Sequence, residues 1–231
     1  MNGIQFNEIK SRLADWREER HLTYENQKKG FLGNVFEEVS EYFRAKDDYE
    51  RIDAICDIAV FFFNAYDFKY RAVFSRMDYY TFSDVVVYNI YSLFGVRTDE
   101  LCVVENENAL LYLENHLNLT MFEIEQLCKN LGFDFFKCMI ETIKEIESRT
   151  GYYDDKIGKF VKDLGAYHYD EALEKASKDF EFLNNATSCC LLKENENFWH
   201  IACEDKYKGR YKEYIIKKWY KANYENCRIR G

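Results

Sequence analysis

Two acidic pairs at helical spacing are the feature that most constrains this chain. Glu38 and Glu41 are three residues apart, and Asp53 and Asp57 are four residues apart. Both spacings place the two side chains of a pair on one face of a helix. The second pair leads directly into the apolar run at 60–63, so its helix is expected to be apolar nearly all round and central in the fold.

The segments that carry these acids are predicted to form two antiparallel helices, at about 30–46 and 48–66. Asp47, with Glu50 three residues later, resembles a capping box at the start of the second of these helices. The short link between the helices favours an antiparallel pair, which brings the two acidic pairs face to face. Carboxylates that face an apolar interior are costly unless they are paired or metal-bound, and a cage of oxygens suits Mg²⁺ or Mn²⁺. The alternative interpretation is a solvated acidic helix face.

Composition excludes several classes of protein. The chain has 231 residues, of which 47% are hydrophobic and none is proline; this allows a large core and long helices. Its net charge of −9 disfavours a general nucleic-acid-coating role. No apolar stretch reaches the roughly 18 residues of a membrane span, and the N-terminus lacks a signal-peptide pattern. We therefore expect a cytoplasmic protein with reduced thiols.

The eight cysteines have two interpretations. Cys56, Cys128 and Cys138 lie in apolar, helix-like surroundings and are expected to be small core residues. A zinc site is the weaker alternative for the others, since the sequence has no Cys-x-x-Cys pair. Its candidate ligands are Cys189, Cys190, Cys203, Cys227 and His200.

The remaining periodicities predict a further set of elements. Helices are expected at 4–20, 82–94, 107–116, 120–131, 134–149, 170–184 and 211–224, a loop at 151–162 and a β-hairpin at 189–203. Thr120 is the expected N-cap of the helix at 120–131, and Gly132 is expected to end it.

The acidic motifs, taken together, resemble those of a known family. The pattern Glu-Glu-x-x-Glu at 37–41, followed by an acidic pair before an apolar run, resembles the MazG-like branch of the all-α NTP pyrophosphatases, particularly its phage and bacterial members. The segments 132–151, 158–163 and 218–224 add to the resemblance. The similarity covers about 25–66, 130–163 and 216–227, and leaves about 67–129 and 165–212 as lineage-specific insertions.

The resemblance implies a fold and a domain organisation. The expected fold is mainly α, a helical bundle of the all-α NTP pyrophosphatase type with a possible small β-hairpin near 189–203. The expected organisation is a single domain over 1–231 that carries the two insertions.

The chain departs from the family pattern at the second motif, which in the family reads Glu-x-x-Asp. Here the acid before Asp57 is Asp53, four residues back, whereas Glu50 and Asp53 fit the letters one turn earlier; Glu50 therefore stays a possible ligand.

The resemblance also implies an activity, the metal-dependent hydrolysis of (deoxy)nucleoside triphosphates to monophosphate and pyrophosphate. Glu38, Glu41, Asp53 and Asp57 would hold Mg²⁺, or Mn²⁺, and Glu38 would take the proton from the attacking water. Glu37 is the alternative base, although an exposed helix residue is the simpler interpretation for it. The expected substrate-binding residues are Asn64, Arg149, Lys156, Lys159 and Lys162. Ordinary surface charge is the alternative for the lysines, and a satisfied core amide for Asn64.

Two other functions stay open from the sequence. One is a non-catalytic helical interaction protein, from a bacterium or a phage, which would need no cation. The other, less favoured because of the acidic balance, is a single-strand nucleic-acid binder that uses the basic aromatic stretch at 217–221. The expected location is the bacterial or phage-infected host cytoplasm. The aromatic residues of the insertions at about 67–129 and 165–212 either extend the core of one chain or form a subunit interface, and of these we favour the interface of a homodimer.

Overall fold

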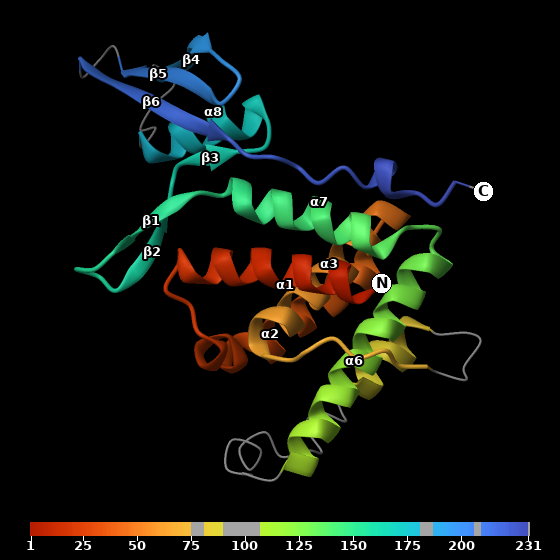
Figure 1. The fold of residues 1–231 in the computed structure, drawn as a ribbon. Helices are drawn as coiled ribbons and strands as arrows, with labels where there is room; N and C mark the ends of the chain where they lie inside the picture. The colour runs from red at the N-terminus through yellow and green to blue at the C-terminus, as the bar shows by residue number, and fades with distance from the viewer. Residues whose placement is uncertain (75–80, 90–106, 181–186, 206–208, 231) are drawn as a thin grey trace. The chain divides into compact units, whose positions relative to one another are not determined.

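The structure is a computed structural model that describes residues 1–74, 81–89, 107–180, 187–205 and 209–230 (Figure 1). Its contacts divide the chain into two compact units. We call Met1–Ile143 with Asn223–Gly231 the helical unit, and Lys144–Ala222 the sheet unit. The expectation of a single domain with insertions at about 67–129 and 165–212 stays a prediction. Parts of the first insertion, 75–80 and 90–106, lie outside the described residues.

The expected fold class, a mainly α bundle with a small hairpin, is wrong. The sheet unit contains a four-stranded mixed sheet and a separate two-stranded sheet. Two stretches account for the difference. Residues 151–162, expected to be a loop, form a hairpin, and residues 211–218, expected to be helical, form a strand. In the described ranges, no helix is long and apolar enough to cross a membrane.

Three N-terminal helices build the helical unit: α1 (Gly3–Glu18), α2 (Tyr24–Arg44) and α3 (Asp48–Ala65). The third is central, as predicted, and contacts α1, α2 and α6. Its side chains are apolar on most faces, and Ile52, Ile55 and Ile58 are at most 1% exposed. Burial of that much apolar surface is the main force that holds this unit together.

Asp47 is the N-cap of α3, as predicted, although the Glu50 carboxylate accepts from the backbone N–H of Lys46 and not from that of Asp47. Its carboxylate accepts hydrogen bonds from the backbone N–H groups of Tyr49 and Glu50, both at 2.9 Å. The connection from α2 is only three residues long, since α2 ends at Arg44 and α3 begins at Asp48. The cap therefore fixes where α3 starts, and so fixes the positions of Asp53 and Asp57 along the helix axis.

We expect Asp47→Ala to lower the free energy of unfolding by about 1 kcal/mol, because an N-cap side chain satisfies backbone N–H groups that have no partner inside the helix. Denaturant unfolding followed by circular dichroism would measure this. Asp15→Ala is the matched control: Asp15 is exposed on α1 and caps nothing, so its loss should change stability by less than about 0.5 kcal/mol. Equal effects of the two changes would contradict the capping role.

The rest of the helical unit comprises α6 (Glu107–Asn130), the first part of α7 (Phe135–Ser148), a short π-helix η1 (Ser83–Val87) and a 3₁₀ turn η2 (Tyr224–Cys227). The two helices predicted at 107–116 and 120–131 are one helix, so Thr120 is not an N-cap. Its hydroxyl donates to the His116 carbonyl at 2.9 Å, which satisfies it inside the helix. Gly132 ends α6 with φ +85°, as predicted. The helix predicted at 82–94 is confirmed at 82–89; residues 90–94 lie outside the described ranges.

The sheet unit has two β structures. Strands β1 (Gly151–Asp154) and β2 (Lys159–Lys162) form an antiparallel hairpin whose turn is closed by Gly158, at φ +62°. Strands β3 (Gly165–Ala166), β4 (Thr187–Glu194), β5 (Phe198–Asp205) and β6 (Arg210–Lys218) form the mixed sheet in the order β3-β6-β5-β4. The β4–β5 hairpin is the one predicted near 189–203.

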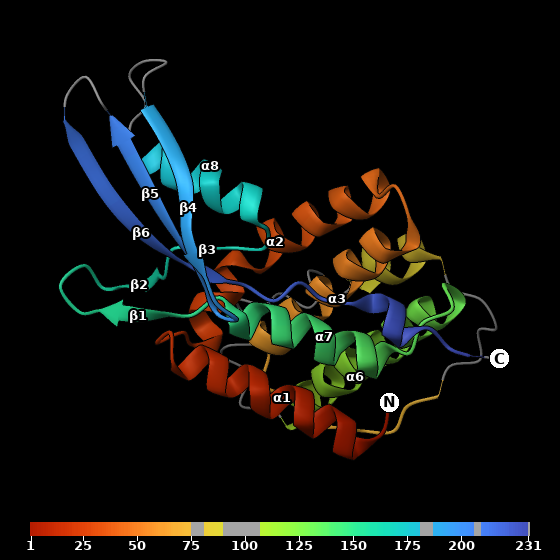
Figure 2. The ribbon, with the colours of Figure 1, turned by 90° about the horizontal axis from the view of Figure 1, so that it is seen from above.

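Helix α8 (Tyr169–Asp179) covers one face of the mixed sheet (Figures 1 and 2). Ala172 and Ala176 let the helix approach closely, and Trp199, Ile201 and Ile216 project towards it. In β6, the buried residues Tyr214 and Ile216 alternate with exposed neighbours. That two-residue period is a strand pattern, and the basic aromatic composition of 211–224 hid it from the sequence analysis.

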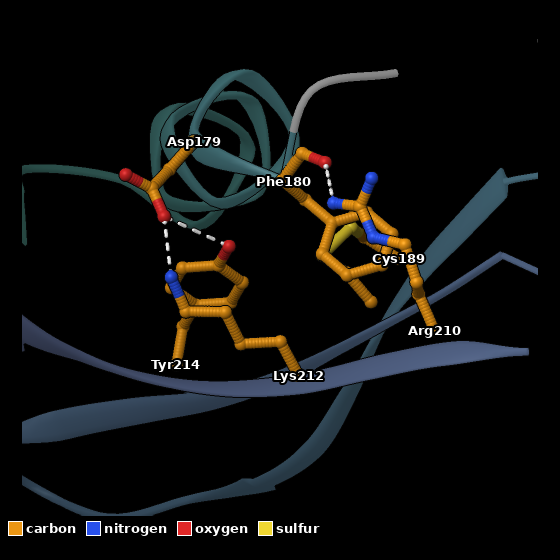
Figure 3. The surroundings of a disulfide bond; sticks show 7 residues. Asp179, Phe180, Cys189, Arg210, Lys212 and Tyr214 are labelled. Atoms are coloured by element: carbon orange, nitrogen blue, oxygen red, sulfur yellow. Dashed lines mark hydrogen bonds and ion pairs between the residues drawn. A yellow bond between two sulfur atoms is a disulfide. The ribbon is translucent and has the colours of Figure 1, made fainter. Parts of the chain in front are cut away.

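The end of α8 is fastened to the sheet beside a disulfide (Figure 3). The Asp179 carboxylate accepts from Lys212 Nζ at 2.7 Å and from the Tyr214 hydroxyl at 2.9 Å. Cys189 and Cys203 stand opposite each other in the β4–β5 register and are joined as a disulfide. The expectation of reduced thiols is therefore wrong for this pair, and the pair is unavailable to the zinc site considered above. Cys56, Cys128 and Cys138 are buried free thiols in the helical unit, as predicted.

Candidate metal centre

The two acidic pairs meet where α2 and α3 lie side by side. Near one end of the helix pair, the rings of Phe31 and Phe62 are 4.9 Å apart. Phe31 comes early in α2 and Phe62 late in α3, so the two helices are antiparallel, as predicted. Seven to ten residues on from Phe31, Glu38 and Glu41 therefore lie at the level of Asp53 and Asp57. Glu41 is exposed, and the other three acids are partly buried.

The pKa of Glu38 shows that the acids of α2 and α3 lie close to one another. Its pKa is raised from 4.5 to about 8, first by burial and then by the negative charges of Asp57, Glu41, Asp53 and Glu37. Both causes disfavour the ionised carboxylate. Within the ranges that the structure describes, no hydrogen bond or ion pair to Glu38 offsets them. The cluster therefore concentrates negative charge that a cation would neutralise.

Tyr224 is a member of this site that the sequence analysis did not single out. Its hydroxyl lies 2.6 Å from Asp53 Oδ1, to which it donates, and 3.0 Å from the Thr142 hydroxyl. Burial, together with the charge of Asp53, raises the pKa of Tyr224 well above its usual value, so the phenol stays protonated and able to donate. Tyr224 is the last residue of the segment 218–224, which resembles the C-terminal motif of the family. That resemblance was the sequence signal that could have identified it. The contact joins α7 and the C-terminal segment to the acidic helix and orients Asp53.

The donor chemistry of this cluster fits a hard divalent cation. All four donors are carboxylates, which Mg²⁺ and Mn²⁺ prefer, and they come from two rigid helices. As the side chains stand, however, no three His, Cys, Asp or Glu residues of the described chain are arranged to hold a metal ion. Mutual repulsion of like charges keeps carboxylates apart in the absence of a cation. For these carboxylates to surround a cation, their side chains would have to rotate on the two helices.

Glu50 has a different role in the structure. It is exposed, and its carboxylate accepts a hydrogen bond from the backbone N–H of Lys46 at 2.7 Å. Glu50 is also not among the four acids that raise the pKa of Glu38, whereas Asp57 has the largest effect of the four. Both facts favour Asp53 and Asp57 as the second acidic pair. Glu50 as a ligand stays a prediction with less support.

Asn64 is committed to the packing of α1. It is 2% exposed, and its Oδ1 accepts a hydrogen bond from Arg17 Nη1 at 2.8 Å. This is the satisfied core amide that the sequence left as an alternative. The sequence analysis did not single out Arg17. Its signal was an arginine in line with Ile9 and Leu13, which lie at four-residue intervals on the buried stripe of α1.

Arg149 directly follows the last residue of α7 and belongs to the sheet unit. Its guanidinium pairs with the Glu145 carboxylate at 2.7 Å and donates to the Tyr167 hydroxyl at 2.6 Å. Glu145 is 5% exposed and also accepts from the backbone N–H of Ala222 at 2.8 Å. These hydrogen bonds and charges outweigh burial and lower the pKa of Glu145. Arg149 thus has a structural role that accounts for its charge, and a contact with substrate stays a prediction.

Lys156, Lys159 and Lys162 belong to the β1–β2 hairpin, and all three are exposed. Lys156 lies in the turn, while Lys159 and Lys162 are the first and last residues of β2. A hairpin carrying several lysines could present them to phosphate groups. The hairpin and the acidic cluster belong to different units, so the role of these lysines towards the cluster stays a prediction.

The basic aromatic stretch at 217–221 is occupied by contacts within the sheet unit. Lys217 Nζ donates to the Thr150 hydroxyl at 2.7 Å, and Lys218 pairs with Glu194 and lies 5.0 Å from the centre of the Trp199 ring. Trp219 packs edge-on against Tyr167. These side chains are therefore not arranged as an open stacking platform.

Comparisons with protein-family models, with curated proteins and with solved structures gave no match.

Proposed function

We propose that this protein hydrolyses (deoxy)nucleoside triphosphates to monophosphate and pyrophosphate with Mg²⁺, or Mn²⁺, held by Glu38, Glu41, Asp53 and Asp57. The observation that carries the proposal is the environment of Glu38, whose pKa of about 8 reflects burial beside four other acids. A strongly perturbed carboxyl in a cluster of like charges is typical of functional sites. The MazG-like sequence pattern supplies the reaction class.

The roles of the residues follow from their positions. When bound, Mg²⁺ neutralises the triphosphate and polarises the scissile phosphate. We assign the general base to Glu38, because it is partly buried among the other acids, whereas Glu37 is exposed. Among the neighbouring acids, Asp57 has the largest effect on the pKa of Glu38. Tyr224 holds Asp53 in position through its hydrogen bond.

The activity is tested with a panel of canonical and modified nucleoside triphosphates in Mg²⁺, with and without EDTA. We expect at least one substrate to give monophosphate and pyrophosphate in equal amounts, and the reaction to stop in EDTA. Chromatography of the nucleotide products together with a pyrophosphate-specific assay measures both. Nucleoside diphosphate and orthophosphate as products would contradict cleavage between the α- and β-phosphates.

A non-catalytic helical interaction protein is the second candidate. The observation in its favour is that, over the described ranges, no side-chain group is already arranged to hold a metal. Thermal unfolding discriminates between the two functions, since a specifically bound cation raises the Tm in a saturable way. The same melting curve at every Mg²⁺ concentration, together with no turnover of the panel, would favour the interaction protein.

A homodimer and a nucleoside triphosphate are the proposed partners. Light scattering at micromolar concentration tests the dimer, and a monomeric mass with full activity would exclude it. Single-strand nucleic-acid binding is disfavoured by the net charge of −9 and by the intramolecular contacts of Lys217 and Lys218. A cytoplasmic location also stays a prediction.

A further inference from the structure

A cavity of about 650 Å³, wide open to solvent, lies in the helical unit, where α1 ends and α2 begins. It is lined by Ala14, Arg17, Glu18, His21, Leu22, Thr23 and Tyr24. Its volume is within the range of small-molecule sites. None of these residues is a member of the acidic cluster, so the cavity is a separate feature of the helical unit.

Arg17 is the unusual residue of this cavity. It is only 6% exposed, and a buried guanidinium is costly unless its charge is balanced. Its three hydrogen bonds all go to neutral acceptors: the Phe63 carbonyl at 3.3 Å, Asn64 Oδ1 at 2.8 Å and the Tyr24 hydroxyl at 2.9 Å. In the described ranges no carboxylate forms an ion pair with Arg17.

The Tyr24 ring, whose centre lies 4.4 Å from the guanidinium carbon of Arg17, offers only the partial negative charge of its face, so the charge of Arg17 stays incompletely balanced. The carbonyl end of α3 provides a partial negative charge of about one half. A guanidinium has five N–H donors, so three bonds leave two donors without a partner among the described residues. Glu18 also lines the cavity, but it is exposed and makes no ion pair with Arg17. Thr23 and Tyr24, at the N-terminal end of α2, add the positive end of a helix dipole.

We propose that this cavity binds a phosphate group, with the Arg17 guanidinium as the main donor. Arginine prefers phosphate because its planar donors match the oxygens of the anion. An incoming oxyanion would supply the missing negative charge and accept the two remaining N–H groups. Inorganic phosphate, pyrophosphate and the phosphate of a nucleotide share this chemistry.

The test uses the full chain in EDTA, so that it does not depend on a cation at the acidic cluster. Thermal shift and calorimetry are measured with sodium phosphate against sodium chloride of equal ionic strength. We expect saturable stabilisation by phosphate. Ala14→Glu should weaken phosphate binding by about tenfold or more, because the new carboxylate lies one turn before Arg17 and occupies its donors. Parallel titrations with pyrophosphate and a nucleoside monophosphate identify the natural source of the group.

Three variants make the result specific. Ala14→Gln has nearly the same size without the charge and should retain binding. Asn7→Glu adds the same charge at an exposed position of α1 away from the cavity and should also retain it. Asp57→Asn alters the acidic cluster and should leave phosphate binding unchanged, whatever it does to hydrolysis. The absence of saturable stabilisation, or undiminished binding by a folded Ala14→Glu variant, would overturn the proposal.

Discussion

Replacing Asp57 by Asn, or Glu38 by Gln, is expected to lower kcat/KM for pyrophosphate release by at least about 100-fold. Loss of one preorganised electrostatic contact to a transition state typically costs two to three orders of magnitude. Asp57 is the strongest charge acting on Glu38, and Glu38 is the proposed base. Both substitutions preserve side-chain size on well-packed helices, so circular dichroism and the Tm should show a folded protein.

Two neighbouring acids serve as matched controls for this prediction. Glu37→Gln makes the same chemical change at an exposed position one residue away and should reduce activity by less than about threefold, since surface changes are usually mild. Glu50→Gln should also be mild, because Glu50 is engaged with the Lys46 backbone. An inactive Glu50→Gln beside an active Asp57→Asn would show that the true acidic pair lies one turn earlier. An inactive Glu37→Gln would assign the base to Glu37.

The acidic helices could be predicted from sequence because every local signal agreed. Asp47 gave the start of α3, the absence of proline allowed long helices, and the apolar run after Asp57 placed α3 in the core. These signals lie within about 40 residues of chain. Helix–helix contact then follows from the short link, which is why both the antiparallel pairing and the proximity of the acids were predictable.

The sheet unit could not be predicted in the same way, because its signals depend on distant partners. Strand β6 pairs with β5 and with β3, which lies about 45 residues earlier in the chain. Its basic and aromatic residues are equally compatible with an exposed helix, and only packing against α8 selects the strand. The disulfide likewise depends on the β4–β5 register, which places Cys189 opposite Cys203.

Two residues of the helical unit were missed for a related reason. Tyr224 reaches Asp53 from 171 residues away, and Arg17 reaches Asn64 from 47 residues away. Each looks ordinary in its own segment and gains its role only from the side chain that it meets. The acidic pairs, in contrast, sit on consecutive helices. The local sequence pattern therefore predicted the carboxylates. It did not predict Tyr224, which positions Asp53, or Arg17, which hydrogen-bonds Asn64.

The metal-free protein is expected to lose stability as the pH rises from about 5 to about 8. The pKa of Glu38 is near 4.5 in an unfolded chain and about 8 in the folded one, so over this range the unfolded state releases the proton and the folded state retains it. The unfolded state then binds fewer protons, and stability falls with pH. Below about pH 4.5 this contribution vanishes, and above about pH 8 it is fully unfavourable.

Glu38→Gln should remove this dependence. In EDTA at pH 8.5 the variant is expected to melt a few degrees above the wild type, since about 1 kcal/mol moves the Tm of a 150–250-residue protein by about 2–4 °C. At pH 5 the two proteins should melt together. Glu8→Gln, at an exposed position of α1, is the control and should follow the wild type at both values.

Mg²⁺ should reverse the order of wild type and variant. A cation that binds ionised carboxylates competes with the proton on Glu38, so the rise in wild-type Tm on adding Mg²⁺ should be larger at pH 8.5 than at pH 6. Glu38→Gln, which lacks this ligand, should gain little at either pH. Equal Mg²⁺ stabilisation of both proteins would place the cation away from Glu38. A wild-type Tm that is flat from pH 5 to pH 8 in EDTA would show that Glu38 is not strained by its neighbours, and the observation that supports the metal centre would be lost.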